Sequence, residues 1–146
     1  MKITSAVATV LALAASASAA FSSCGSASDD FAFGSVSYLP NPPKVNQQLC
    51  ITLKGTLKKE VTAGASLRVS ATFWGMNVYD STIDLCASLV GGANPCPIPT
   101  TTTEVTQCIT VPSNVPAGVS LGIKAEAKRS TGERIFCISG PITFSN

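Results

Sequence analysis

Six cysteines are the most reactive side chains of this sequence, and they stand at positions 24, 50, 86, 96, 108 and 137. An even number of cysteines in a short chain is typical of a secreted domain in which they pair as disulfides. Metal binding is the competing chemistry, but the sequence has no C-x-x-C spacing and no histidine to complete a site. The cysteines therefore predict a disulfide framework, with no metal and no other cofactor.

Carboxylates are the other candidates for chemistry. Asp29 and Asp30 are adjacent, and Asp80 and Asp84 are close in sequence, so either pair resembles a general acid and base. Adjacent residues of an extended chain point to opposite faces, however, and no partner for these groups is evident. The lack of histidine also excludes Ser-His and Cys-His nucleophiles. We expect these aspartates to be solvated loop residues and the protein not to be an enzyme.

The first twenty residues have the composition of a secretory signal peptide. Lys2 precedes an apolar run over 7–15, and small residues over 16–20 suit cleavage after Ala19 or Ala20. The apolar run is shorter than the roughly 20 residues of a membrane-spanning helix, although a retained anchor is the alternative. We expect a signal peptide at 1–20, one domain at 21–146, and a secreted protein or one of the vacuolar or endolysosomal lumen.

The charge balance is nearly even, with ten basic and eight acidic residues. No concentrated basic face of the kind that binds nucleic acid is evident. Lys58-Lys59 and Lys128-Arg129, with Arg134 nearby, flank two expected turns at one end of the fold. They are either solvated turn residues or a site of attraction for an anionic membrane or phosphate headgroup. Nothing in the sequence demands more than a monomer.

Alternation of apolar and polar residues with a period of two dominates the chain after residue 20 and predicts β-strands. Leu49, Ile51 and Leu53, for example, share one face of the stretch 47–56. A bulge at Gly140-Pro141 is expected to shift the alternation of the last strand. The expected strands cover 30–38, 47–56, 65–74, 77–85, 100–111, 119–126 and 133–144. Seven short strands in this order predict an all-β, immunoglobulin-like antiparallel β-sandwich.

Several phrases of this sequence resemble those of one protein family. Asp84-Leu85-Cys86 is followed, after nine residues, by Cys96-Pro97-Ile98. Pro40-Asn41-Pro42-Pro43 leads into the strand around Cys50, and Ile109-Thr110-Val111-Pro112 leads into Pro116-Ala117-Gly118. In this order and spacing the phrases resemble the ML-domain lipid-recognition family, which includes the Niemann-Pick type C2 sterol carrier and fungal phosphatidylglycerol/phosphatidylinositol transfer proteins.

The resemblance implies a non-enzymatic carrier that holds a phospholipid or a sterol in an apolar cavity between the two sheets. Each methylene group removed from water contributes ~0.8 kcal/mol, so a lipid chain needs no charged contact. The cavity candidates are the apolar strand faces and one loop residue, namely Leu53, Leu67, Val69, Phe73, Leu85, Val111, Val115, Leu121, Ile123, Phe136 and Phe144. The expected bulge leaves the facing of Phe136 and Phe144 open.

Alternation alone fits a filled core equally well. The alternative function is therefore a secreted recognition or effector protein with a solid, disulfide-stapled core and no transfer activity. In the family the loop corresponding to 112–118 contributes to the cavity mouth, which is why Val115 is included. Trp74 and Tyr79 are amphipathic aromatic residues that suit transient membrane contact, or are ordinary exposed aromatics.

The resemblance also implies two cysteine pairs, Cys24–Cys137 and Cys86–Cys96. Cys50 and Cys108 remain, and both lie on the polar faces of strands that are neighbours in an immunoglobulin-like sandwich. Directly opposite side chains on antiparallel strands are close enough to be bridged. The last two cysteines therefore form a third pair, Cys50–Cys108, or stay as free thiols.

Overall fold

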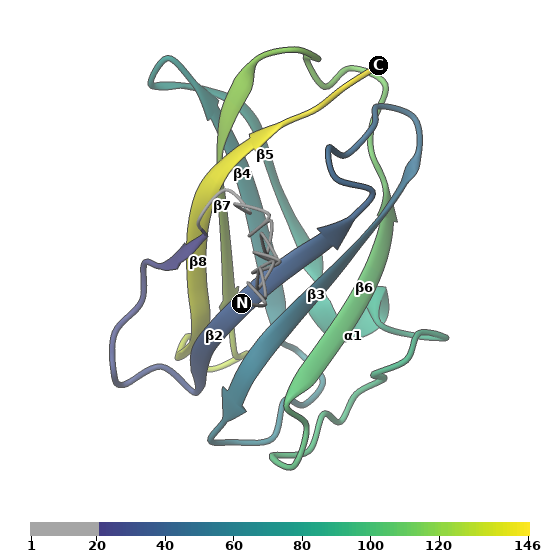
Figure 1. Ribbon diagram of the computed structural model, residues 1–146. Coiled ribbons are helices and arrows are strands. Elements are labelled where there is room, and N and C mark those ends of the chain that lie inside the picture. The colour runs from purple at the N-terminus through teal and green to yellow at the C-terminus, as the bar shows by residue number, and fades with distance from the viewer. Residues whose placement is uncertain (1–20) are drawn as a thin grey trace, which may run out of the picture.

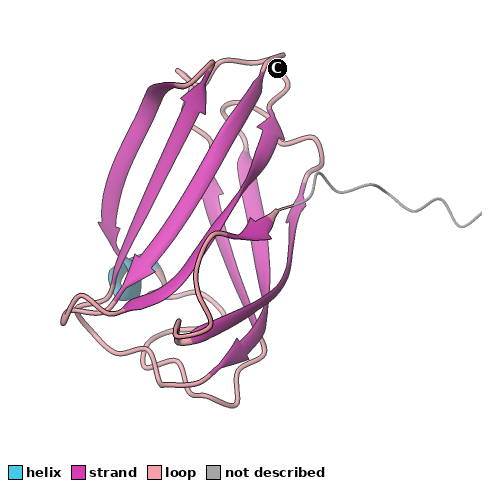
Figure 2. Cartoon of the chain, turned by 90° about the vertical axis from the view of Figure 1, so that its left-hand side faces the viewer, coloured by secondary structure: helices cyan, strands magenta, loops and turns pink. Residues whose placement is uncertain are grey.

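Two antiparallel β-sheets pack face to face in the computed structural model, which describes residues 21–146 (Figure 1). The larger sheet has the strand order β1-β8-β7-β4-β5, and the smaller one has the order β2-β3-β6. The strands are β1 (Ser22–Ser23), β2 (Phe31–Leu39), β3 (Gln48–Leu57), β4 (Ser66–Phe73), β5 (Met76–Asp84), β6 (Glu104–Thr110), β7 (Ser120–Lys128) and β8 (Arg134–Thr143), and the short helix α1 spans Leu85–Ser88. Figure 2 shows the sheets as two layers. The expected signal peptide at 1–20 lies outside the described residues.

The predicted all-β sandwich is confirmed, and the seven expected strands correspond to β2 through β8. Sequence did not predict β1, which is only two residues long and pairs with β8, or the single turn of helix α1. β6 begins at Glu104 and not at Thr100, because the chain first turns, with the amide of Thr102 donating to the carbonyl of Pro99. Within residues 21–146, no helix is long and apolar enough to cross a membrane.

The predicted bulge at Gly140-Pro141 is wrong. β8 pairs regularly with β7 from Leu121↔Ile142 to Ala127↔Phe136, and the register shifts only beyond Ala127. Pro141 is tolerated because β1 covers β8 only as far as Ser139, so the missing N–H interrupts no ladder at this free edge. Partners in an antiparallel pair share a face, so Phe136 lies on the same inward face as Ile142, and Phe144 is buried at the end of this face.

Two separate clusters of buried side chains occupy the two ends of the sandwich. The lower cluster lies near the β3–β4 and β7–β8 turns and contains Phe31, Leu57, Val61, Ala65, Cys86, Leu89, Ile98, Ala127 and Ile135. The upper cluster lies near the C-terminus and contains Leu49, Val111, Leu121, Ile142 and Phe144. Folded domains usually have one contiguous core, so the division into two is the feature of this fold that matters for function.

The segment 85–103 closes the lower end of the sandwich. Asp84 caps helix α1 by accepting a hydrogen bond from the amide of Ala87 at 2.9 Å, and Leu89 after the helix is only 2% exposed. Val61 and Ile98 exchange backbone hydrogen bonds of 3.0 and 2.9 Å, which fix the end of the segment against the β3–β4 connection. The lower end is therefore closed by the Cys86–Cys96 disulfide and by backbone hydrogen bonds, as well as by packing.

Three disulfides join Cys24 to Cys137, Cys50 to Cys108 and Cys86 to Cys96, which are the pairs expected above. Cys50 and Cys108 stand directly opposite each other on β3 and β6, with their Cα atoms 3.9 Å apart. They lie on the outer face, because the neighbouring Leu49 is buried inside, and the hydroxyls of Thr52 and Thr106 meet at 3.0 Å beside them. The Cys50–Cys108 disulfide therefore joins β6, an edge strand of the smaller sheet, covalently to its neighbour β3.

Replacing both Cys50 and Cys108 with serine should lower the free energy of unfolding by about 2–4 kcal/mol, because the unfolded chain loses a constraint. Lipid binding should be unchanged, because neither side chain faces the interior. Urea unfolding followed by circular dichroism measures the first effect. Retention of full stability in the double variant would show that the bond contributes nothing to the fold.

Candidate functional site

The inward faces of the two sheets carry half-buried apolar side chains between the two buried clusters. Leu53 on β3 and Leu67 on β4 pack against the lower cluster, and Phe73 and Ile123 pack against the upper one. Val69 lies opposite Ala125 and is assigned to neither cluster, although it faces inward. We call this region the central section, and we define it by Ile51, Leu53, Leu67, Val69, Val105 and Ile123, all of intermediate exposure. Ala71 and Ile138, on the same inward face of the larger sheet, are buried, at 4% and 7% exposed. Apolar residues on an inward face that keep access to solvent indicate incomplete packing.

One side of the interior is not sealed, the side between β5 and β6. Tyr79 lies opposite Ala71, and Ile109 lies opposite Leu49; Ala71 and Leu49 are 4% and 3% exposed, so these pairs face inward. Tyr79 and Ile109 are nevertheless 41% and 44% exposed, and Ile83 further along β5 is 42% exposed. β5 and β6 are the edge strands of different sheets, so within residues 21–146 no strand pairs across this side. Inward-facing apolar side chains are therefore exposed to solvent along the side between β5 and β6, which we take as the candidate opening of the central section.

Part of the β6 edge is covered by the loop after helix α1. The side chain of Asn94 accepts a hydrogen bond of 3.1 Å from the amide of Thr106, and the Gln107 side chain donates one of 2.8 Å to the carbonyl of Ser88. The loop therefore covers the lower part of β6 and leaves the part around Ile109 open. Gln107 and Ser81 face inward at this opening and supply an amide and a hydroxyl beside the apolar surface.

The structure brings the predicted cavity residues to the interior but places them differently. Leu53, Leu67, Leu85 and Phe136 pack around the lower cluster, while Phe73, Val115 and Ile123 pack around the upper one. Val111, Leu121 and Phe144 are 2%, 2% and 8% exposed and belong to the upper cluster itself. Val69 alone is in neither cluster. Val111, Leu121 and Phe144 are therefore part of a packed core, whereas Val69 belongs to the central section.

Sequence reasoning missed several residues of the interior. They all lie on strands that had been predicted, at alternating positions of the inward face, and they are Phe33, Tyr38, Ile51, Tyr79, Ile83, Val105 and Ile109. For Tyr79, Ile83, Val105 and Ile109, the signal that could have found them is the same period of two, applied to β5 and β6 as strictly as to β4 and β7. Ile51 shares the predicted apolar face of Leu49 and Leu53. Phe33 and Tyr38 lie on opposite sides of a register shift in β2, which a strict period of two does not predict.

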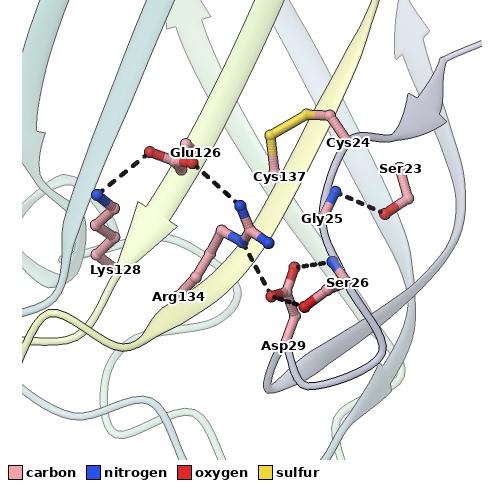
Figure 3. The surroundings of a disulfide bond; sticks show 9 residues. All are labelled: Ser23, Cys24, Gly25, Ser26, Asp29, Glu126, Lys128, Arg134 and Cys137. Atoms are coloured by element: carbon pink, nitrogen blue, oxygen red, sulfur yellow. Dashed lines mark hydrogen bonds and ion pairs between the residues drawn. A yellow bond between two sulfur atoms is a disulfide. The ribbon is translucent and has the colours of Figure 1, made fainter.

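The prediction that Asp29 and Asp30 are solvated loop residues is wrong, because they are only 5% and 4% exposed. Asp29 accepts hydrogen bonds from the side chain of Arg134 at 2.9 Å and from the amide of Ser26 at 3.2 Å (Figure 3). Asp30 pairs with Arg129 and, at 3.9 Å, with Lys59. The Cys24–Cys137 disulfide holds the segment 24–30 against β8, and this closeness makes the buried pairing possible.

The basic residues near the lower turns are engaged in this network. Arg129 also donates to the backbone carbonyls of Glu60 and Lys59, at 2.6 and 3.2 Å. Glu126 approaches Arg134 at 3.6 Å and Lys128 at 3.5 Å, and the hydrogen bond from Arg134 to Asp29 raises the pKa of the guanidinium above its ordinary value. These groups therefore tie the lower turns together, which favours a structural role over attraction of an anionic headgroup.

Two pockets of about 320 and 360 Å³ lie beside the same network. Both are lined in part by Ser26 and Asp29, and one also by Lys59, Glu133 and Arg134. The first pocket also contacts Phe31, Ala32 and Phe33, but the ion-paired carboxylate of Asp29 forms part of the lining of both pockets. We therefore assign the candidate site to the central section between the sheets, where the inward-facing side chains are mostly apolar.

Three disulfides and two facing antiparallel sheets with an apolar interior define an immunoglobulin-like sandwich. The family model described as the ML domain matches residues 18–144. The chain belongs to this family.

Curated relatives include phosphatidylglycerol/phosphatidylinositol transfer proteins of fungi. That of Candida albicans is 33% identical over 105 residues, covering 72% of this chain and 54% of the relative. That of Aspergillus oryzae is 30% identical over 99 residues, covering 68% and 56%. The chain thus spans a little over half the length of these relatives.

Solved structures with the same fold include a Niemann-Pick type C2 protein from the Japanese carpenter ant, with a TM-score of 0.63 and 20% identity over 86% of this chain and 99% of that one. Chicken MD-1, solved in complex with lipid IVa, has a TM-score of 0.58 and 16% identity over 84% and 87%. At these identities the two structures support the fold.

Proposed function

We propose that this protein is a non-enzymatic lipid carrier, which holds a phospholipid such as phosphatidylglycerol or phosphatidylinositol, or a sterol, between its two sheets. The observation that carries the proposal is the central section, where inward-facing apolar side chains stay half-buried between two packed clusters. The names of the fungal relatives and the lipid IVa bound to MD-1 support the same class of ligand.

The apolar part of the ligand enters between β5 and β6 and completes the core. Its chain contacts Val69 and Leu53, and it joins the upper and lower clusters into one apolar interior. About 15 buried methylene groups would contribute about 12 kcal/mol, and an association cost of about 4 kcal/mol leaves about 8 kcal/mol, which corresponds to micromolar affinity. Binding therefore needs no charged side chain in the interior.

The polar part of the ligand stays at the opening. Ser81 and Gln107 are the polar side chains that face inward there, and Gln107 is already oriented by its bond to the carbonyl of Ser88. Neither side chain carries a charge, so the opening accepts a headgroup by hydrogen bonding and does not select a charged one. Phospholipid and sterol therefore remain joint candidates.

The setting of the carrier is part of the proposal. Residues 1–20 direct the chain into the secretory pathway and are removed, and the carrier works as a monomer outside the cell or in the lumen of an organelle on that pathway. The three disulfides support this location, because such bonds persist in oxidising compartments. Membrane contact is transient and serves lipid exchange.

Transfer of fluorescent phosphatidylglycerol and of a fluorescent sterol between donor and acceptor vesicles tests the proposal. The protein should raise the transfer rate of at least one lipid in proportion to its concentration, and heat-denatured protein should not. If neither lipid moves, and none is extracted from the vesicles, the solid-core alternative replaces the carrier.

A further inference from the structure

Charged side chains are distributed very unevenly between the two ends of the sandwich. The segments that make up the upper end, 39–47, 73–79, 111–123 and 141–146, contain a single charged side chain, that of Lys44. The lower end holds the buried aspartates and their basic partners. The upper end therefore suits contact with an apolar surface, against which a charged side chain would have to be desolvated.

Large apolar side chains project from this uncharged end. Trp74 and Met76, at the β4–β5 turn, are 86% and 63% exposed. Phe73, the last residue of β4, instead packs against the upper cluster. The turn lies at the top of Figure 1, beside the loop 112–118, because Thr72 pairs with Gly122 near the start of β7. Trp74 and Met76 thus form an exposed apolar tip, which we call the hairpin tip.

The backbone of the hairpin tip is strained in order to present tryptophan. Trp74 and Gly75 form a two-residue turn in which both φ angles are positive, 53° and 74°. Asn-Gly fits such a turn best, and a bulky side chain with positive φ is a genuine outlier. Gly75 meets the requirement without strain, so only Trp74 carries the cost. The indole makes an edge-to-face contact with Phe73, with ring centroids 6.0 Å apart, but stays 86% exposed. A residue that costs stability and gains so little burial points to a role outside the fold.

We propose that the hairpin tip is a membrane-docking element, which inserts Trp74 and Met76 into the interfacial layer of a bilayer and brings the opening between β5 and β6 to the lipid surface. The partner is the lipid surface itself, because tryptophan favours the headgroup level and residues 73–79 contain no charged side chain that would have to be desolvated. This inference rests on the proposed function, since a lipid carrier must exchange its ligand with a bilayer. Docking is apolar, so it needs no anionic lipid.

Trp74 is the only tryptophan of the sequence, so its fluorescence reports docking directly. On addition of phosphatidylcholine vesicles we expect a blue shift of the emission, quenching by brominated lipid, and the same binding at 0.1 and about 0.5 M salt, where the Debye length is below 5 Å. No shift with any vesicles, or binding that needs phosphatidylglycerol and disappears in salt, would overturn the proposal. In the first case the hairpin tip would be assigned to protein recognition. In the second case membrane binding would be assigned to the basic residues of the lower end.

Trp74→Asn separates docking from folding. The variant should raise the Tm by about 4 °C, because asparagine suits the turn, yet weaken co-flotation with phosphatidylcholine vesicles roughly tenfold or more. Val90→Ser is the matched control, because Val90 is 78% exposed but follows helix α1 at the lower end, and its flotation should equal that of the wild type. Lys44→Gln should also be neutral. Equal losses in Trp74→Asn and Val90→Ser would contradict the assignment.

Lipid content measured without vesicles distinguishes this inference from the proposed function. Trp74→Asn should retain as much bound lipid as the wild type, because Trp74 does not face the central section. If the wild type carries lipid and Trp74→Asn still co-floats with vesicles as well as the wild type does, docking through the hairpin tip is refuted and the carrier function stands. A wild type that never carries lipid refutes the carrier, whatever the flotation shows.

Discussion

Val69→Phe is expected to reduce lipid binding at least tenfold while leaving the free energy of unfolding unchanged or higher. Val69 faces inward between Ala125 and Ser81 and belongs to neither buried cluster, so the larger ring would occupy the space that we assign to the ligand. If that space is filled by an acyl chain in the wild type, the ring replaces it and completes the core. Lipid extraction with mass spectrometry and urea unfolding measure the two quantities on the same sample.

Ala127→Phe is the matched control for this experiment. Ala127 also faces inward, on β7, but it is fully buried in the lower cluster, where an added ring has no free volume. Overpacking of this kind costs typically 1–3 kcal/mol or more. If Val69→Phe destabilises the protein as much as Ala127→Phe does, the central section is solid and the site assignment is wrong.

Arg129→Ala is expected to lower the free energy of unfolding by about 3–5 kcal/mol. The guanidinium pairs with the buried Asp30 and donates to two carbonyls of the β3–β4 turn, so its removal leaves a buried carboxylate with only Lys59 at 3.9 Å. Urea unfolding monitored by circular dichroism gives the value. Arg129→Lys should recover little of it, because an ammonium group cannot make the same forked contacts.

Arg68→Ala provides the comparison with an exposed pair. Arg68 donates to Asp80 at 2.9 Å on the outer face, and this hydrogen bond lowers the pKa of Asp80 below its ordinary value. Because folding lowers that pKa, the pair stabilises the fold above the ordinary aspartate pKa, and the contribution is lost as the pH falls through the lowered pKa. Near neutral pH its removal should change stability little, since water screens it. Similar losses for Arg68→Ala and Arg129→Ala would contradict a special role for the buried network.

The sequence was a good guide to the strands, because each one has a polar and an apolar face that the period of two makes visible. The opposition of Cys50 and Cys108 followed from that alternation and the expected strand order. The bulge was misplaced because glycine and proline usually interrupt a strand, whereas here Pro141 lies where β8 has a free edge. Local sequence does not show which edge of a strand is free.

The burial of Asp29 and Asp30 could not be read from their neighbours in the sequence. Their partners Arg134 and Arg129 are about a hundred residues away, and only the folding back of segment 24–30 brings them together. Five basic residues around two turns at one end of the fold were a signal that acidic partners were needed there. The packing of the central section was equally hidden, because alternation gives the direction of a side chain and not how well it packs.

The central claim is that a lipid completes the core between the two sheets. Native mass spectrometry of the folded protein, purified from cells and again after incubation with vesicles of phosphatidylglycerol, phosphatidylinositol and sterol, tests it most directly. We expect one lipid per chain on the wild type and none on Val69→Phe. Bare protein in both wild-type samples, or equal lipid on both chains, would contradict it.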